Sequence, residues 1–226
     1  MEAANSVRQG DIILLEIHRG GPNANGQGQF GYIAVEWWPD DLAAIRYAVN
    51  RGVIVVEAAG NGTQNLDDPI YDSRPADFPA TWNNPFNPAN TTSGAVLVGA
   101  GNPPKGTHGR DRQASWNEPY VDRARCGFSN YGRRIDCQGW GWEVTSTGYG
   151  DLPGGVSDRN KWYIDEFSGT SSASPIIAAT LASLQGILKA AGRPLLTPTQ
   201  AIQLLRTTGS PQQDAPGRPA SERQSS

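Results

Sequence analysis

The apolar positions of the chain fall into short unbroken runs separated by stretches of helical periodicity. Nearly continuous apolar runs occupy residues 11–17, 53–59 and 95–100. Runs of this length without polar alternation are typical of parallel strands that are covered on both faces. Between the first two runs, a helix predicted to start at Pro39 carries its apolar residues on one face: Leu42, Ile45 and Val49. The order strand, helix, strand with short joints predicts a βαβ unit.

A longer helical pattern follows a Gly-Thr-Ser turn near residue 170. Its apolar residues recur at a period near 3.6 and are Ile176, Ile177, Leu181, Leu184, Ile187 and Leu188. This spacing predicts a well-buried helix that starts at or just after Ser171.

Two shorter helices are predicted near the ends of the chain. Residues 2–9 read as a helix stopped by Gly10, and Thr197 with Gln200 has the form of a capping box that opens another helix. From Ser210 onward Pro, Gln, Ser and charged residues dominate. We therefore expect one domain over residues 1–209 and a disordered tail over residues 210–226.

Composition and charge narrow the class of protein. The 226 residues are 37% hydrophobic, which is enough for one domain with a core, and 27 glycines and 17 prolines predict many loops. A net charge of −3 provides no basic stripe, so we expect no nucleic-acid partner. No sequence run approaches the roughly 18 apolar residues of a membrane span, so we expect no membrane partner.

Ser171 is a candidate nucleophile because of its place at a helix start. Free backbone N–H groups and the positive end of the helix dipole favour an anion there, as an attacking serine needs when an oxyanion forms. The alternative is that Ser171 merely caps the helix, since serine is common at that position.

Three stretches resemble the subtilisin-like serine proteases, in that family's order. Residues 169–175 match the nucleophile motif Gly-Thr-Ser-x-Ala-x-Pro, and residues 53–62 are similar to the strand and turn that end in the oxyanion-hole asparagine, here Asn61. Residues 128–132, after the run at 95–100, resemble the paired strands between them. The similarity covers residues 5–209, about the C-terminal two-thirds of such a domain.

The resemblance implies both a fold and an activity. The fold would be α/β, a mostly parallel sheet with helices on both faces, as in a truncated subtilisin-like three-layer sandwich. The activity would be hydrolysis of peptide or ester bonds through an acyl-enzyme on Ser171, with Asn61 and the Ser171 N–H holding the oxyanion.

The sequence departs from the family at the residues that would act as general base and orient it. The family's catalytic Asp and His precede the strand that resembles residues 11–17, and no Asp-Ser/Thr-Gly or His-Gly-Thr motif occurs here. Three explanations stay open: a missing N-terminal half on another polypeptide, a weaker hydrolase with a substitute base, or a non-catalytic binding or assembly module. An incomplete triad should impair amides more than esters, because an amine leaving group needs a proton from the base.

Two side chains are candidates for a substitute base. Alternation along the predicted strand places Glu16 and His18 on one face near the nucleophile, and a histidine titrates near neutral pH. For His18 a structural role is an equal alternative. Glu57 reads as a buried acid that makes structural hydrogen bonds, and His108 reads as an exposed loop histidine.

Partners and cofactors follow from the same comparison. Without the family's preceding strand, residues 11–17 form an exposed edge, so we expect a homo-oligomer or pairing with a missing N-terminal fragment. Cys126 and Cys137 could form a disulfide or remain two buried thiols. Aspartates in the loop at residues 62–94 raise the question of calcium, but their spacing matches no calcium loop, and we expect no cofactor. Family habit favours an extracellular location.

Overall fold

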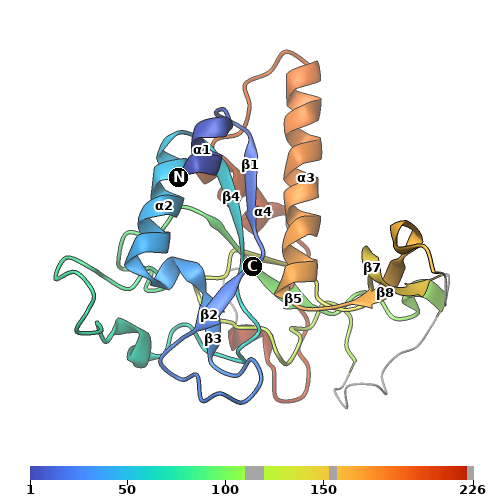
Figure 1. Ribbon diagram of the computed structural model, residues 1–226, viewed down its shortest axis with the longest axis horizontal. Helices are drawn as coiled ribbons and strands as arrows, with labels where there is room; N and C mark the ends of the chain where they lie inside the picture. Colours follow the sequence, from blue (N-terminus) through green and yellow to red (C-terminus); the bar gives the residue numbers. More distant parts are fainter. Residues whose placement is uncertain (110–119, 153–156, 223–226) are drawn as a thin grey trace.

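The computed structural model describes residues 1–109, 120–152 and 157–222. Its central sheet has four parallel strands in the order β1-β4-β5-β6 (Figure 1). These strands are β1 (Ile12–Leu15), β4 (Ile54–Ala58), β5 (Val96–Gly101) and β6 (Cys137–Trp140). Two antiparallel pairs are separate from it: β2 (His18–Gly20) with β3 (Tyr32–Ala34), and β7 (Val144–Leu152) with β8 (Tyr163–Phe167). The α-helices are α1 (Glu2–Ser6), α2 (Pro39–Asn50), α3 (Thr170–Ala190) and α4 (Pro198–Thr208).

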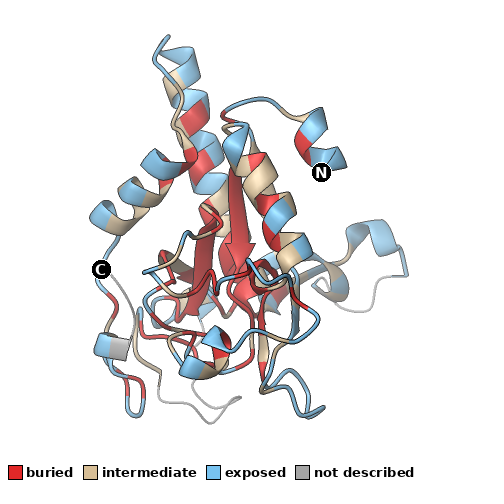
Figure 2. Ribbon diagram, turned by 90° about the vertical axis from the view of Figure 1, so that its left-hand side faces the viewer, coloured by how far each residue is buried: buried red, intermediate tan, exposed pale blue. Residues whose placement is uncertain are grey.

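Helices cover both faces of the central sheet, so the predicted α/β class is confirmed. Alternate residues of β4 point to opposite sides: Val55 packs with Ile45 of α2, whereas Val56 packs with Ile177 of α3. Figure 2 shows these strands as the buried centre of the molecule. The strand is apolar on both faces because each face has its own helix layer.

The long loop after β4 has a separate aromatic core. Trp37, Tyr71 and Trp82 are buried there, and the indole of Trp82 donates to the carbonyl oxygen of Trp37 at 3.0 Å. This packing gives the loop at residues 62–94 a fixed shape against Leu97 of β5. The prediction of an irregular loop is correct in secondary structure, but the loop is well packed.

Strand β1 lies at the edge of the described sheet and is shorter than the sequence suggested. Its four residues are half-buried, and Ile17 just beyond it is 57% exposed. The strand ends at Leu15 because the chain turns away and pairs again from His18 with β3. Glu16 and His18 therefore do not lie on one strand, and the alternation argument that put them on one face does not apply.

Helix α3 is the longest element of the structure and lies against the sheet. Its Ala173, Ile177 and Leu181 are buried against the sheet, where α3 contacts all four strands. Over an 18-residue window its mean hydropathy is 1.3, and it is the one described helix long and apolar enough to cross a membrane. Its inner face packs on the sheet, but only 33% of that window is buried and Ile187 is 65% exposed, so the helix is less buried than its apolar spacing predicted.

The segment that follows α4 differs from the expected disordered tail. Gln212, Ala215 and Arg218 are buried, and the Gln213 N–H donates to the carbonyl oxygen of Arg123 at 3.3 Å. The polar composition was misleading because these side chains pack against residues 121–126. Residues 223–226 of the predicted tail lie outside the described residues.

Candidate active site

The turn after β4 and the first turn of α3 meet at one end of the sheet, where the carboxyl ends of its strands lie. The Thr170 N–H and the Thr170 hydroxyl both donate to Asn61 Oδ1, each at 2.8 Å. The Gly60 N–H donates in turn to Thr170 Oγ1 at 3.2 Å. Asn61 thus caps α3 from 109 residues away, a role that Gly169 at the N-cap cannot fill because it has no side chain.

This cap also fixes the direction of the other half of the Asn61 amide. With Oδ1 held by two donors, planarity sets where Nδ2 points. A Cβ built on Gly169, whose φ is +109°, would lie 3.2 Å from Asn61 Nδ2 and 3.6 Å from the Ser171 nitrogen. The two nitrogens therefore both lie within 3.6 Å of one point beside Gly169.

Asn130 holds the turn that carries Asn61. Its buried amide donates to the carbonyl oxygens of Ala59 (2.7 Å) and Tyr32 (2.8 Å). Its Oδ1 accepts from the N–H groups of Gly62 (3.1 Å) and Gln64 (2.8 Å). Residues 128–132, which resemble part of the family's paired strands, form no strand here beyond a bridge between Tyr131 and Asn65, and the sequence motifs gave Asn130 no role. No local pattern signals this role, because the four bonds join Asn130 to residues between 66 and 98 positions away.

Ser171 lies half-buried in the first turn of α3 with its hydroxyl directed at the end of β1. Its Oγ donates to the backbone carbonyl oxygen of Glu16 at 3.2 Å. Glu16 thus reaches the site through its main chain, and partial burial raises the pKa of its carboxyl. Among the hydrogen bonds of residues 1–109, 120–152 and 157–222, none joins Ser171 Oγ to a carboxylate or an imidazole.

His18 contacts the turn that carries Asn61 rather than Ser171. Its Nδ1 accepts the Asn61 backbone N–H at 3.2 Å, and its ring lies 4.9 Å from the ring of Tyr32. Burial lowers the pKa of His18, which favours the neutral imidazole. A neutral ring that accepts at Nδ1 carries its proton on Nε2, so its lone pair is already used by Asn61. This geometry supports the structural alternative for His18, and the surrogate-base role stays a prediction.

Glu57 lies behind the turn in a buried polar network. Its Oε1 accepts the Glu36 N–H at 2.9 Å, and Glu36 pairs at 2.8 Å with Arg134, which also pairs with Asp136. Burial, followed by repulsion from Glu36, raises the pKa of Glu57 well above its usual range. These contacts agree with the structural role that the sequence favoured.

His108 and the aspartates of the acidic loop each have hydrogen-bond partners within the chain. His108 Nε2 lies 2.9 Å from the Glu143 carbonyl oxygen. In the acidic loop, Asp68 caps a short 3₁₀ helix and Asp72 accepts from Asn84 and Asn87. No group of three or more His, Cys, Asp or Glu side chains within the described ranges is placed to hold a metal ion.

Cys126 and Cys137 are both free thiols in the structure. Burial, with Asp136 nearby, raises the pKa of the Cys137 thiol. Of the two alternatives, the structure has the pair of thiols.

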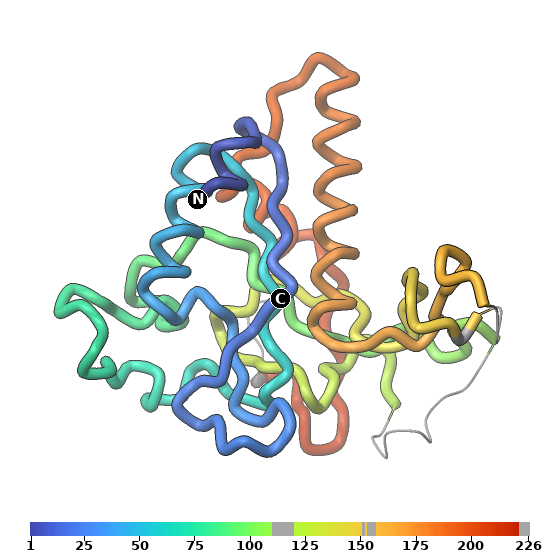
Figure 3. Tube along the Cα trace, viewed as in Figure 1, coloured from blue at the N-terminus to red at the C-terminus, as the bar shows by residue number. Residues whose placement is uncertain are grey.

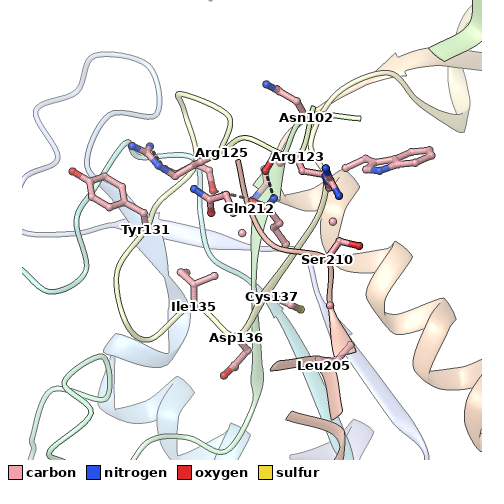
Figure 4. Close-up of a pocket in the computed structure, with 18 of the residues that line it drawn as sticks. Asn102, Arg123, Arg125, Tyr131, Ile135, Asp136, Cys137, Leu205, Ser210 and Gln212 are labelled. Carbon is pink, nitrogen blue, oxygen red and sulfur yellow. Dashed lines mark hydrogen bonds between the residues drawn. The ribbon is translucent and has the colours of Figure 1, made fainter. Parts of the chain in front are cut away.

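A cavity of about 260 Å³ lies beside β6 (Figure 4). Arg123, Arg125 and Gln212 contribute its polar lining, and the Arg125 guanidinium lies 4.0 Å from the ring centre of Tyr131. None of Ser171, Asn61, Glu16 and His18 lines it. The cavity shares with the site only Asn130, which lines it and also holds the turn that carries Asn61.

The chain is similar to several known proteins. An extracellular protease of Xanthomonas campestris pv. campestris is 28% identical over 165 residues, which cover 73% of this chain and 21% of that protein. A cold adapted subtilisin-like serine proteinase has a TM-score of 0.52 at 20% identity, covering 96% of this chain and 55% of the other. The patellamide maturation protease PatA has a TM-score of 0.56 at 19% identity, covering 98% of this chain and 60% of the other.

The chain therefore spans about a fifth of the curated relative and little more than half of these solved structures. At such identities the structural likeness shows the fold alone. The model of the Subtilase family matches residues 24–224, a range that includes Asn61 and Ser171. The chain belongs to the subtilase family.

Proposed function

We propose that this chain is a serine hydrolase of peptide or ester bonds that forms an acyl-enzyme on Ser171. Ser171 Oγ attacks the substrate carbonyl carbon, and the bond from that carbon to the amine or alcohol breaks. Water then hydrolyses the acyl-enzyme and releases the acyl group. Asn61 Nδ2 and the Ser171 N–H hold the oxyanion. The observation that carries the proposal is the Thr170 N–H bond to Asn61 Oδ1, which fixes the oxyanion donor to the helix that bears the nucleophile.

In this proposal the activity is limited by removal of the proton from the Ser171 hydroxyl. The Glu16 carbonyl accepts the hydroxyl hydrogen bond, but an amide carbonyl is too weak a base to take the proton. Two groups near the site could do so: the Glu16 carboxylate, or His18 once Nδ1 leaves the Asn61 N–H. With its triad incomplete or rearranged, the chain cleaves esters better than amides, because an alkoxide or phenoxide leaves with less proton donation than an amine.

A second candidate function is assembly through strand β1. The strand lies at the edge of the described sheet, and Ile17 beside it is exposed. Backbone groups along such an edge are ready to pair with another strand. The partner would be a second copy of the chain or an N-terminal fragment that carries the missing base. An extracellular site of action is part of the proposal, supported by the name of the curated relative.

Reaction with a fluorophosphonate tests the first candidate. An activated serine attacks the phosphorus, a P–O bond forms and fluoride leaves, so the intact mass rises by one adduct. We expect this adduct in the wild-type protein and in Ser183→Ala, an exposed serine of the same helix, and not in Ser171→Ala.

An adduct that persists in Ser171→Ala would refute the assignment of the nucleophile. A folded protein with no adduct in any form would favour the assembly function, which sedimentation of the wild-type chain then tests directly.

A further inference from the structure

The proposed oxyanion donor already has an acceptor from its own chain. Asn61 Nδ2 donates to Oε1 of Gln29 at 3.1 Å. Gln29 lies in the exposed Gly/Asn/Gln-rich loop that connects β2 to β3. In Figure 3 this blue loop lies at the same end of the sheet as the first turn of α3, in orange.

The base of the loop is fixed to the oxyanion turn, and this holds Gln29 in place. The Gly31 N–H donates to the Gly62 carbonyl oxygen at 3.0 Å, and the Tyr32 N–H donates to the Gln29 carbonyl oxygen at 3.0 Å. A Cβ on Gly62 would lie only 2.2 Å from the Tyr32 oxygen, so glycine is required for this approach. Gln29 therefore lies two residues from Gly31, whose hydrogen bond to Gly62 anchors the loop.

The chemistry of the contact is that of a substrate. A side-chain amide oxygen is the same functional group as the carbonyl of a peptide bond. It lies at hydrogen-bond distance from the nitrogen that would hold that carbonyl during acyl transfer. The Ser171 hydroxyl is likewise held by a carbonyl of the chain, that of Glu16. One of the two Asn61 Nδ2 donors and the Ser171 hydroxyl are thus both bonded to carbonyls of the chain itself.

We propose that Gln29 is a self-ligand of the oxyanion donor, which a substrate carbonyl must displace before Ser171 can react. The inference rests on the proposed function. Gln29 makes its hydrogen bond in the free protein and loses it in the complex, so it weakens substrate binding and leaves the chemical step unchanged. In kinetic terms it raises KM and not kcat.

The test compares Gln29→Ala with Gln27→Ala, a matched exposed glutamine of the same loop. At limiting reagent, we expect Gln29→Ala to react with the fluorophosphonate about 2- to 10-fold faster than wild type, the factor equivalent to one net hydrogen bond. Gln29→Glu should react more slowly than wild type, because a carboxylate is a stronger acceptor and repels the oxyanion. Gln27→Ala should match wild type. With an activated ester, Gln29→Ala should lower KM and leave kcat unchanged.

Unchanged or slower labelling in Gln29→Ala, with the wild type labelled at Ser171, overturns the inference alone. Labelling of Gln29→Ala but not of the wild type supports both the inference and the proposed function. If no variant is labelled, both fail.

A measurement that does not depend on reactivity checks the contact itself. The Asn61 side-chain amide resonances, assigned by their loss in Asn61→Asp, should shift in Gln29→Ala and stay in place in Gln27→Ala. If they do not move in Gln29→Ala, the hydrogen bond is absent and the inference is wrong.

Discussion

The Thr170 hydroxyl is the part of the site whose removal gives the most direct test of the geometry. Thr170→Val keeps the branched shape and removes Oγ1, which accepts from the Gly60 N–H and donates to Asn61 Oδ1. Thr170 is 1% exposed, so water does not replace either bond. A buried N–H left without an acceptor costs about 1–3 kcal/mol, and the lost bond to Asn61 adds about 1 kcal/mol.

We therefore expect Thr170→Val to lower the free energy of unfolding by about 2–4 kcal/mol. For a protein of this size this corresponds to a fall in Tm of about 5–15 °C. Thermal unfolding followed by circular dichroism measures it, with Thr170→Ser as the control because it retains the hydroxyl. Labelling of Ser171 should also slow in Thr170→Val, since Asn61 Oδ1 is then held by one donor only.

The result that would refute this reasoning is equal Tm values for Thr170→Val and Thr170→Ser. The hydroxyl would then not join the turn after β4 to α3, and the fixed position of the oxyanion donor would lose its physical basis.

Three further predictions concern other parts of the site and the sheet edge. Gly169→Ala places a Cβ 3.2 Å from Asn61 Nδ2 at a φ of +109°, so we expect Ser171 labelling to slow and Tm to fall. The control Gly186→Ala, where nothing lies within 4 Å of the added Cβ, should leave labelling unchanged and raise Tm, because alanine favours a helix interior over glycine. Burial lowers the pKa of His18, so the unfolded chain binds a proton at this residue more readily than the folded chain does. The contribution of His18 to the free energy of unfolding should therefore be fully present above a pH of about 6.5, which is its ordinary pKa, and should be lost as the pH drops toward its folded pKa. Denaturant titrations should show this slope in the wild type and lose it in His18→Gln. Ile17→Glu adds a charge beside the edge strand and should weaken any self-association seen by sedimentation; an unchanged sedimentation coefficient in an associating protein would show that β1 is not the interface.

The parts of the fold that the sequence predicted are those set by local periodicity. The βαβ unit of β1, α2 and β4 and the long helix α3 follow from apolar spacing alone, because one helix layer covers each face of the sheet. The capping box at Thr197 is also confirmed, since its reciprocal bonds lie within four residues.

The features that were missed depend on residues that are distant in the sequence. The end of β1 at Leu15 is set by pairing with β3, and the packing of Gln212 is set by residues near Arg123. In the site, family motifs marked Asn61 and Ser171. The hydrogen bond between His18 Nδ1 and the Asn61 N–H joins residues 43 apart, and no pattern around His18 announces it.

The cap that Asn61 provides has a consequence for how this site could be completed. The Thr170 bonds hold Asn61 against the helix that bears Ser171, so in the proposed function the nucleophile and the oxyanion donor keep a fixed relative position. A second polypeptide that docked nearby would need to supply only a proton acceptor at Ser171 Oγ, without rebuilding the rest. Association of the two polypeptides would then switch the reaction on.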